Sequence, residues 1–537
     1  MLPAEAHESV HARRGMVAAP HLLAAEAGRE VLAEGGNAIE AMVAAAAAIA
    51  VVYPHMNHVG GDGFWLIREP SGRVRYIEAC GFAGAGASVA AYHARGLDAV
   101  PTRGPLAAVT VPGAVDGWRL ALEAARAHGG RMTVRRLLEP AIRHAREGVP
   151  VTRSQSRLTA EKKAELAPAP GFASVFLNAD GSVPEVGQVL RQERLADTLD
   201  HLSGAGLADF YRGDVGREIA ADLERIGSPV TREDLVRYQA IERKPLSVKI
   251  GKARLFNAPP PTQGLASLLI LALFDRLGVA RGDSFEHVHG LVEATKRAFR
   301  LRDAMVCDHD FLPEDPHALL ADAKRLDAIA AGIEMGRALA WPDRSSGGDT
   351  VWLGAADASG LVVSYIQSIF FEFGSGCVLP ATGVLMQNRG ASFSLQPGAL
   401  NPLKPGRRPF HTLNPALAEL ADGRVMAYGT MGGEGQPQTQ AAVFTRHALF
   451  GVPLGEAIAR PRWLLGRTWG DAETRLRLEP RLDGEIIDRL AHVGHDLALV
   501  PEDYSDTMGH AGAVILSPGG DIEGAHDPRS DGGAAGV

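Results

Sequence analysis

The sequence predicts an α+β fold with four layers, αββα, in which two β-sheets face each other and helices cover their outer sides. Two observations lead to this fold class. The N-terminal part alternates segments of helical spacing with glycine-rich turns. Further on, residues 350–371 form a pair of apolar strands whose single charged residue, Asp357, lies in the turn between them. A hairpin with one face in water would alternate polar residues, so both faces of this one must be covered.

The first elements are two helices. Residues 22–32 have helical spacing and end at a pair of glycines, after which Asn37 is placed to cap an alanine-rich helix, with Glu40 returning the capping interaction. Pro54 closes that helix. Its most apolar stretch, residues 41–53, is well short of the roughly 20 residues needed to span a bilayer. We therefore expect a buried helix and no association with a membrane.

A hairpin and two further helices follow. Residues 58–66 turn into a strand, and a tight turn leads to a second strand over residues 74–78. Residues 118–127 and 134–147 carry apolar residues at intervals of three and four, which predicts two helices. Pro140 lies within the second of them, so we expect an interruption there.

The middle third is predicted to be mostly helical. Thr231 offers a helix start, and residues 284–302 form a long amphipathic segment. Between them, the proline-rich residues 258–264 are rigid. A second strand pair, residues 413–420 and 424–430, follows the first and completes the set of elements that two stacked sheets require.

Composition and charge exclude several classes of partner. With 537 residues, 46% of them hydrophobic and 22% charged, the chain is expected to be an ordered globular protein. The net charge of −8, without a cluster of basic and aromatic residues, argues against nucleic acid. No secretory signal is recognisable at the start, so we expect a cytoplasmic location. Cys80, Cys307 and Cys377 are too few and too scattered for a disulfide framework.

Thr350 follows the small and turn-forming residues 346–349, at the point where the first apolar strand begins. A threonine at a chain start can act as a nucleophile, because its free α-amine, with an unperturbed pKa of about 7.7–8.0, accepts the hydroxyl proton near neutrality. An internal threonine has no such amine, so the bond between Asp349 and Thr350 would have to be cleaved. A lone threonine at a strand start is ordinarily a plain strand residue, so its neighbours must support the catalytic interpretation.

Gly432 and Gly433 end the second hairpin and present two successive backbone N–H groups with no side chains in front of them. The segment from Gln436 reads as helical, so the positive end of that helix points to the same place. The pair therefore predicts an oxyanion hole, in which the loss of one donor costs on the order of 3 kcal/mol of transition-state stabilisation. A tight turn from strand to helix is the alternative.

Other kinds of site fit the sequence less well. Three groups contain residues that bind metals, namely His55 with His58, His287 with His289, and Cys307 with His309 and Asp310. None has a matching second cluster or an HExxH arrangement, so we interpret them as structural or surface residues. No GxSxG motif and no complete Walker or GxGxxG motif is present. The glycine-rich residues 59–64 are then a tight turn near the pocket.

The motifs GGNAIEAMVA, VGGDGFW, TVPGAVDGW, TREDLVRY, APPPTQG, FGSG, PGRRPFHTLNPAL, MGGEGQPQ and HDPRSDG occur in an order and approximate spacing that resemble the γ-glutamyltranspeptidases. The similarity runs from about residue 15 to the C-terminus. This family consists of N-terminal-nucleophile hydrolases with an αββα fold, made as precursors that cleave themselves. The resemblance therefore implies a large chain of residues 1–349 and a small chain of residues 350–537, associated as a heterodimer, with a higher oligomer left open.

The resemblance also implies roles for individual residues. Placing the family's TTH-x-SVVD start on TVWLGAAD assigns Thr350 as the nucleophile and the bond from Asp349 to Thr350 as the cleavage site. The family's diglycine oxyanion hole falls on Gly432 and Gly433, and the hydroxyl that supports the nucleophile falls on Ser368.

Substrate-binding positions depart from the transpeptidase pattern. The arginine that holds the α-carboxylate of a glutamyl group is replaced by Cys80, and the aspartate that binds its α-amine is replaced by Ser392. The paired serines of the SSMSP motif become His411 and Thr412. Losing both charged groups removes the contacts that would orient a γ-glutamyl group, so glutathione is not the expected substrate.

Arg389 follows the shared Asn388, at a position where the transpeptidases have a neutral or acidic residue. An arginine fork can hold a carboxylate bidentately. We therefore expect Arg389, Asn388, His411 and Thr412 to bind a small amide that carries an acidic group. A structural ion pair is the alternative interpretation of Arg389.

Several segments, among them GDTVWLGAAD, QNRGASFSL and YGTMGGEGQPQTQAA, look most like the oxamate amidohydrolase branch of the superfamily. This implies conversion of oxamate to oxalate and ammonia by an N-terminal threonine, without a cofactor or a metal. The alternatives are a γ-glutamyl hydrolase or transferase, a cephalosporin-type acylase, and an unprocessed, inactive relative that serves as a binding protein.

Overall fold

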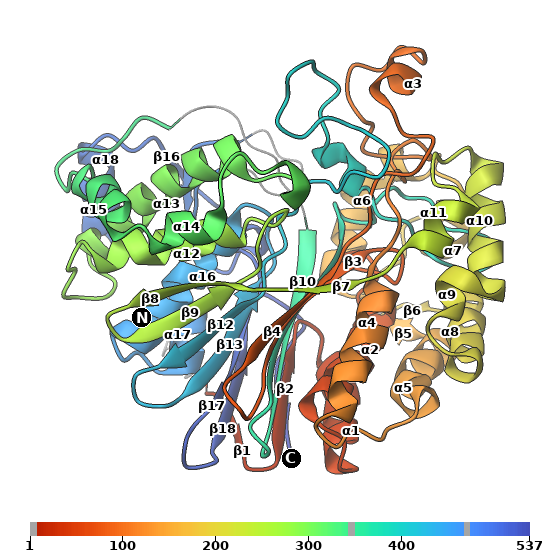
Figure 1. The fold of residues 1–537 in the computed structure, drawn as a ribbon, viewed down its shortest axis with the longest axis horizontal. Helices are drawn as coiled ribbons and strands as arrows, with labels where there is room; N and C mark the ends of the chain where they lie inside the picture. Colours follow the sequence, from red (N-terminus) through yellow and green to blue (C-terminus); the bar gives the residue numbers. More distant parts are fainter. Residues whose placement is uncertain (1–7, 342–348, 467–472) are drawn as a thin grey trace.

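The computed structural model describes residues 8–341, 349–466 and 473–537 (Figure 1). Within these residues, two antiparallel sheets of seven strands each dominate the fold. Sheet I has the order β19 (Gly533–Gly536), β2 (Gly15–Ala19), β10 (Asp349–Asp357), β11 (Val362–Phe370), β3 (Asp62–Arg68), β4 (Val74–Ala79), β7 (Ile241–Arg243). Sheet II has the order β1 (Val10–Ala12), β18 (Ile522–His526), β17 (Ala511–Leu516), β13 (Val425–Thr430), β12 (Ala416–Leu420), β9 (Ala253–Asn257), β8 (Leu246–Ile250).

The two sheets pack face to face through a buried apolar cluster to which both contribute. Phe64 and Trp352 of sheet I, for example, belong to the same cluster as Leu417 and Val514 of sheet II. Because strands alternate their side chains between two faces, each strand in this layer also needs apolar residues on its outer face. Strand β11 accordingly has all nine of its residues buried.

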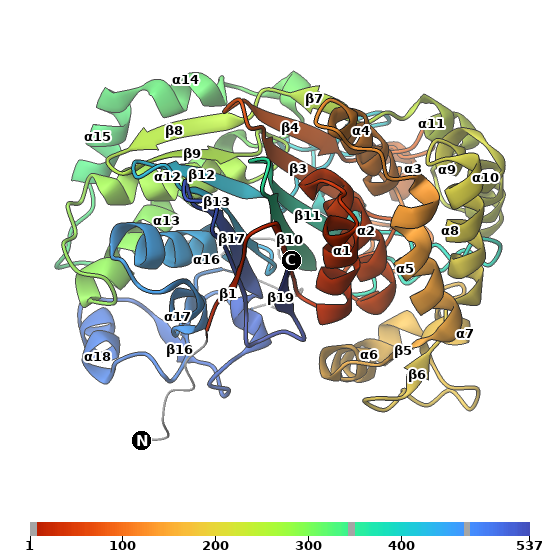
Figure 2. The same ribbon diagram turned by 90° about the horizontal axis from the view of Figure 1, so that it is seen from below.

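Helices cover the outer faces of both sheets (Figures 1 and 2). The outer face of sheet I shares a core with α1 (Leu22–Ala33), α2 (Ala38–Val52), α4 (Ala114–Arg126), α5 (Val134–Glu147), α6 (Arg153–Leu166), α7 (Phe172–Phe176), α8 (Glu193–Ala205), α9 (Asp209–Arg212), α10 (Asp214–Ile226) and α11 (Arg232–Arg237). Sheet II shares a core with α12 (Gly264–Asp275), α13 (Phe285–Met305), α14 (Pro316–Ala321), α15 (Ala323–Ala331), α16 (Gly435–Phe444), α17 (Leu454–Ala459) and α18 (Gly484–His492). The predicted four-layer αββα architecture is thus confirmed.

Smaller elements complete the described chain. They are the strands β5 (Val149–Pro150), β6 (Val189–Leu190), β14 (Trp463–Leu464), β15 (Leu476–Leu478) and β16 (Leu497–Leu499), the helix α3 (Val89–His93), the 3-10 turns η1 (His309–Phe311), η2 (Arg389–Ser392) and η4 (Asp506–Met508), and the π-helical turn η3 (Thr445–Leu449). None of the helices in the described ranges combines the length and the apolar character that crossing a bilayer requires.

The predicted helix starts are confirmed in detail. The Asn37 side chain accepts from the N–H groups of Ile39 and Glu40, while the Glu40 carboxylate accepts from the backbone N–H of Asn37. This reciprocal capping satisfies donors that the first turn of α2 would otherwise leave unpaired. It matters because every residue of α2 is buried, beneath sheet I.

The interruption expected at Pro140 is wrong, because α5 continues through it from Val134 to Glu147. Pro140 removes one helical hydrogen bond, but it lies on the face of the helix that is buried together with Leu137, Leu138 and Ala141. Packing of that face against the neighbouring helices offsets the lost bond.

Trp352 brings the two sheets close together. Its indole lies over three strand glycines: a Cβ at Gly354 or Gly512 would lie 2.6 Å from the ring, and one at Gly429 would overlap it. The ring also donates from Nε1 to the Ser364 hydroxyl at 2.9 Å. Only glycine leaves room for an indole between the sheets at these positions.

We expect the substitution Gly429→Ala to lower the free energy of unfolding by about 2 kcal/mol or more, because the added methyl group must displace the Trp352 indole from a packed layer. The free energies of both proteins are to be compared by denaturant titration. Gly519→Ala is the matched control, since a Cβ at Gly519 meets nothing within 4 Å. The control is expected to change stability by less than about 0.5 kcal/mol. Equal stability of the two variants would contradict the proposed contact.

Candidate active site

Thr350 lies at the beginning of β10, in the buried layer between the sheets. Its Oγ1 accepts a hydrogen bond of 3.1 Å from Nε2 of Gln436, in the first turn of α16. The pairing register of β10 with β11 shifts between Asp349 and Val351, so the predicted cleavage bond sits at an irregular strand start. The turn residues 346–348 before it lie outside the described residues.

Gly432 and Gly433 connect β13 of sheet II to α16. Their φ angles of 113° and 52° both lie in the left-handed region that favours glycine. A tight turn from strand to helix, the alternative interpretation of these residues, is therefore present, and the N-terminus of α16 follows at once; the role of the two glycines as an oxyanion hole stays a prediction. Because Gln436 in this first turn bonds to Thr350, the hydroxyl of sheet I and the diglycine of sheet II belong to one site.

A chain of hydrogen bonds holds this site in place. Gln436 Oε1 accepts from the backbone N–H of Asn414 at 3.3 Å and from its Nδ2 at 3.1 Å. Gln263 Nε2, at the start of α12, donates to the carbonyl oxygens of Thr412 at 2.6 Å and Gly433 at 2.7 Å. Arg302 in turn donates to Gln263 Oε1 at 3.1 Å. Sequence reasoning assigned no role to these polar residues, although Gln263, Asn414 and Gln436 lie in motifs that it singled out.

Arg389 lies within the same site. Its Nη1 donates to Thr412 Oγ1 at 3.3 Å and its Nη2 donates to Ser368 Oγ at 3.4 Å. The guanidinium carbon lies 4.0 Å from the centre of the Phe370 ring. Burial lowers the pKa of Arg389 to about 9, against the opposing effect of Asp62, so the group remains a cation near neutral pH.

Two other predicted residues fix the backbone at the end of β11. Ser368 Oγ accepts from the backbone N–H of Phe370 at 2.8 Å. Asn388 accepts from the N–H of Phe371 at 3.0 Å and donates to the carbonyl oxygen of Thr102 at 2.9 Å. Both ends of the Asn388 amide are thus bonded to backbone, which is the arrangement of a positioning residue.

His411 and Asp62 form the remaining polar part of the site. His411 Nε2 lies 3.8 Å from Asp62 Oδ2, and both side chains are fully buried. Burial lowers the pKa of His411 well below its usual range, so its imidazole is neutral. Asp62 belongs to the glycine-rich turn at residues 59–64, and the sequence carried no signal that its carboxylate would face Arg389 and His411.

Cys80 and Ser392, which the motif resemblance aligns with charged residues of the transpeptidases, are uncharged here. Cys80 is buried in the apolar cluster between the sheets, and burial raises the pKa of its thiol well above the usual range. The Ser392 hydroxyl is also buried, with no hydrogen-bond partner among the described residues. These two positions therefore supply no charge that could hold an amino-acid backbone.

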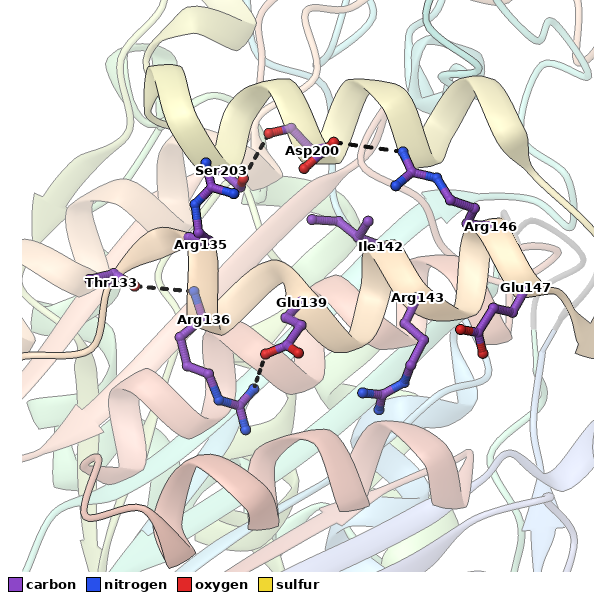
Figure 3. A pocket seen from close by; sticks show the side chains of 10 residues that line it. All are labelled: Thr133, Arg135, Arg136, Glu139, Ile142, Arg143, Arg146, Glu147, Asp200 and Ser203. Carbon is purple, nitrogen blue, oxygen red and sulfur yellow. Dashed lines mark hydrogen bonds and ion pairs between the residues drawn. The ribbon is translucent and has the colours of Figure 1, made fainter.

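A separate hollow of about 560 Å³ lies on the outer helices, between α5 and α8 (Figure 3). Four arginines of α5 line it, and several of them are ion-paired; Arg136 with Glu139 and Arg146 with Asp200 are two such pairs. None of the predicted catalytic or substrate-binding residues lines this hollow. It is a surface feature distinct from the site at Thr350.

The groups singled out as metal-binding alternatives engage protein partners. His55 Nε2 lies 3.0 Å from the Ser154 hydroxyl, and His287 Nε2 lies 2.8 Å from that of Thr445. His289 lies beside Glu293 and His495, but the ammonium group of Lys296 donates to Glu293 at 2.8 Å and fills the role of a cation there. Cys307 is buried, while His309 bonds to the neighbouring Asp308 at 3.1 Å. These contacts support structural roles.

Comparison with known proteins agrees with this geometry. The family model of the γ-glutamyltranspeptidases matches residues 24–537. An oxamate amidohydrolase proenzyme from Klebsiella pneumoniae is 52% identical over 531 residues, covering 99% of this chain and 100% of that protein. A glutathione hydrolase-like proenzyme from Bacillus subtilis is 39% identical over 535 residues, with 99% and 100% covered.

Among solved structures, a cephalosporin acylase from Bacillus halodurans superposes with a TM-score of 0.89 at 32% identity, covering 99% of this chain and 97% of that one. The resemblance predicted from the motifs is therefore confirmed over the whole length of the fold. The chain belongs to the γ-glutamyltranspeptidase family.

Proposed function

We propose that this protein cleaves itself before Thr350 and then hydrolyses oxamate to oxalate and ammonia. The proposal that the substrate bears a carboxylate depends on one observation, the hydrogen-bond partners of the buried arginines. Among the described residues, the arginines whose side chains are almost completely buried include Arg302, Arg389, Arg446, Arg462 and Arg529. Four of these five have a carboxylate partner: Arg302 pairs with Glu434, Arg446 with Asp283, Arg462 with Asp527 and Arg529 with Glu479. The hydrogen bonds of Arg389 go instead to two hydroxyls.

Asp62 acts on Arg389 only from a distance, because the hydrogen bonds of the guanidinium go to neutral hydroxyls. Burying a cation without a directly bonded carboxylate is costly, and a ligand carboxylate bonded to Arg389 would offset that cost. The planar guanidinium suits a carboxylate held by two parallel hydrogen bonds. The site has no second charged group at Cys80 or Ser392, which disfavours an amino-acid substrate. The 52% identity to an oxamate amidohydrolase proenzyme supports oxamate in particular, since it is a small amide with one carboxylate.

Self-cleavage would yield a large chain of residues 1–349 and a small chain of residues 350–537. The sheets favour their staying together as a heterodimer. In sheet I, β10 and β11 of the small chain lie between β2 and β3 of the large chain. Separation would break both of these ladders and expose the apolar layer between the sheets, so the chains should remain associated after cleavage.

The reaction follows from the positions of the groups. Thr350 Oγ1 attacks the amide carbonyl carbon while its α-amine accepts the hydroxyl proton. The N–H groups of Gly432 and Gly433 stabilise the oxyanion, and the amine returns the proton to the departing ammonia. Water, with the same amine as base, then attacks the oxalyl ester and releases oxalate. Gln436 orients the hydroxyl, and Arg389 holds the carboxylate.

The purified protein is expected to run as two chains on a denaturing gel, and the smaller one should begin Thr-Val-Trp-Leu. Thr350→Ala is expected to remain at full length and to release no ammonia from oxamate, because it lacks the attacking hydroxyl. End-group sequencing and an ammonia assay check both points. A wild-type protein that stays uncut during incubation would instead favour an inactive binding protein. Faster release from γ-glutamyl-p-nitroanilide than from oxamate would favour a γ-glutamyl hydrolase.

Arg389→Ala is expected to lower kcat/KM for oxamate about 10- to 100-fold, which corresponds to the loss of a charge-assisted bond worth about 1.5–3 kcal/mol. Self-cleavage should be retained, since the hydrogen bonds of Arg389 to the described residues go to Thr412 and Ser368 and not to the bond before Thr350. Oxamide, the neutral diamide of the same size, serves as the matched control substrate and should be affected far less. An equal loss on both amides would mean that the arginine is only structural.

Gln436→Glu removes the amide donor to Thr350 Oγ1 while keeping an acceptor for Asn414. We expect kcat to fall about tenfold or more, because the hydroxyl loses the bond that orients it. Gln438→Glu is the matched control: Gln438, also on α16, donates to the carbonyl oxygens of Glu434 and Leu465. That change should lower the melting temperature and leave kcat per folded molecule nearly intact. Comparable kcat values for the two variants would refute the orienting role.

A further inference from the structure

The carboxyl group of Asp62 is held from one side only. This residue begins β3 and is completely buried. Its Oδ1 accepts from the backbone N–H groups of Gly81 and Gly113, both at 3.1 Å. Its Oδ2 has no partner at hydrogen-bond geometry among the described residues, although the Gln387 side chain lies near enough to the carboxyl group to lower its pKa. Buried polar atoms are almost always paired, so this oxygen points to a partner that arrives with a ligand or a proton.

Further unpaired atoms lie around this oxygen. Both ring nitrogens of His411 lack a hydrogen-bond partner within the described chain, as does Nε of Arg389. His411 Nε2 is 3.8 Å from Asp62 Oδ2, and its ring packs edge-on against Phe64 with the ring centres 5.0 Å apart. Three residues from separate segments thus lie in one buried cluster, and each of them carries an unsatisfied polar atom.

The charges of this cluster balance while no ligand is bound. Asp62 provides one negative charge and Arg389 one positive charge. The other titratable groups whose charges act on Asp62, His411 or Arg389 are Cys80, Tyr211, Tyr238, Tyr365 and Arg408. The thiol and the three phenols are neutral, since burial raises the pKa of each. Arg408 is paired with Glu78 at 3.1 Å.

A substrate carboxylate at Arg389 would add a second negative charge to a cluster whose single unpaired cation among the described residues is the Arg389 guanidinium. Burying an uncompensated charge costs several kcal/mol, whereas protonating Asp62 removes the excess. We propose that binding of a carboxylate at Arg389 is coupled to the uptake of one proton from solvent by Oδ2 of Asp62. This inference rests on the proposed function in taking Arg389 as the carboxylate site.

The groups around Asp62 favour the uptake of a proton by its carboxyl group. Burial raises the pKa of Asp62 to about 7, even with Arg389 acting in the opposite direction, so the proton is available near neutral pH. A ligand carboxylate raises that pKa further. The new O–H faces the neutral imidazole of His411, which can accept it. No other bond forms or breaks, and the site then holds a monoanion with no net excess of charge.

The proton uptake defines which ligands suit the site. A small monocarboxylate requires one proton, which Asp62 can take. A ligand with two carboxylates would require a second proton, and the remaining acceptor of the cluster, the His411 imidazole, resists protonation because burial lowers its pKa well below the usual range. The specificity that Asp62 confers is therefore for small monoanionic acids, and it weakens as the pH rises above the pKa of Asp62.

Titration calorimetry with propionate, a monocarboxylate without an amide bond, tests the inference at pH 8 in two buffers of different ionisation enthalpy. The wild type is expected to take up about one proton per propionate bound, and Asp62→Asn about none, because the variant already presents an uncharged group. The amide oxygen of that variant still accepts from Gly81 and Gly113. Glu372→Gln is the matched control, since Glu372 is a buried carboxyl with a raised pKa that faces Arg103 rather than Arg389. It should take up one proton as the wild type does.

Kinetics give a second readout. KM for oxamate is expected to rise about tenfold per pH unit above the pKa of Asp62 in the wild type and to stay nearly constant in Asp62→Asn. Titration of the Thr350 amine changes kcat rather than KM, and it raises kcat as the pH increases.

If oxamate is not hydrolysed, the proposed function fails and the calorimetry still decides this inference. Absence of proton uptake by the wild type, equal uptake by Asp62→Asn, or no binding of propionate would each overturn it.

Discussion

The close approach of the two sheets around Trp352 is the constraint on which the rest of the structure depends. The indole fits because strands from both sheets carry glycine beneath it, at Gly354, Gly429 and Gly512. Two residues before Trp352, at the start of the same strand, Thr350 reaches α16 of the facing sheet through its bond to Gln436. A wider separation of the sheets would move the Thr350 hydroxyl away from the diglycine turn. The packing of the core around Trp352 therefore also determines whether the site can assemble.

The site itself is built with little room for rearrangement. Thr350 and Ser368 come from sheet I, the diglycine follows a strand of sheet II, and Gln263 ties that turn to the backbone of Thr412. Such a network restricts the reacting groups to one geometry before a substrate arrives, which is how positioning lowers an activation barrier. The residues that hold these segments together, among them Gln263 and Gln436, carry amide side chains, because an amide can donate and accept hydrogen bonds at the same time.

The balance of buried charge distinguishes this site from the remainder of the core. Several other buried arginines among the described residues are neutralised by carboxylates, as Arg462 is by Asp527. Arg389 instead donates hydrogen bonds to two hydroxyls and lies over the face of the Phe370 ring. Asp62 lies nearby, and one of its carboxyl oxygens has no hydrogen-bond partner among the described residues. This arrangement tolerates one added anion, and the cost of an additional charge in a low-dielectric environment explains why a proton should accompany it.

Local patterns in the sequence predicted much of the fold. The capping of α2 by Asn37, the hairpin of β10 and β11 and the helical start after Gly433 depend on residues close together in the chain. The continuity of α5 through Pro140 was not predictable in this way, because packing against other helices outweighs the lost backbone bond. The family motifs likewise selected Thr350 and Ser368, and a departure from them selected Arg389, which bonds to Ser368.

The sequence by itself determined the αββα architecture, the family and the identity of the residues on which the proposed chemistry depends, since apolar periodicity and motifs are properties of the linear chain. Only the tertiary structure decided that Gln436 bonds to Thr350, that both ends of the Asn388 amide bond to the backbone, and that Asp62 lies beside His411 and within electrostatic reach of Arg389. The physical reason is that a charge or hydrogen bond acts over a few ångströms in space, and these residues are far apart along the chain.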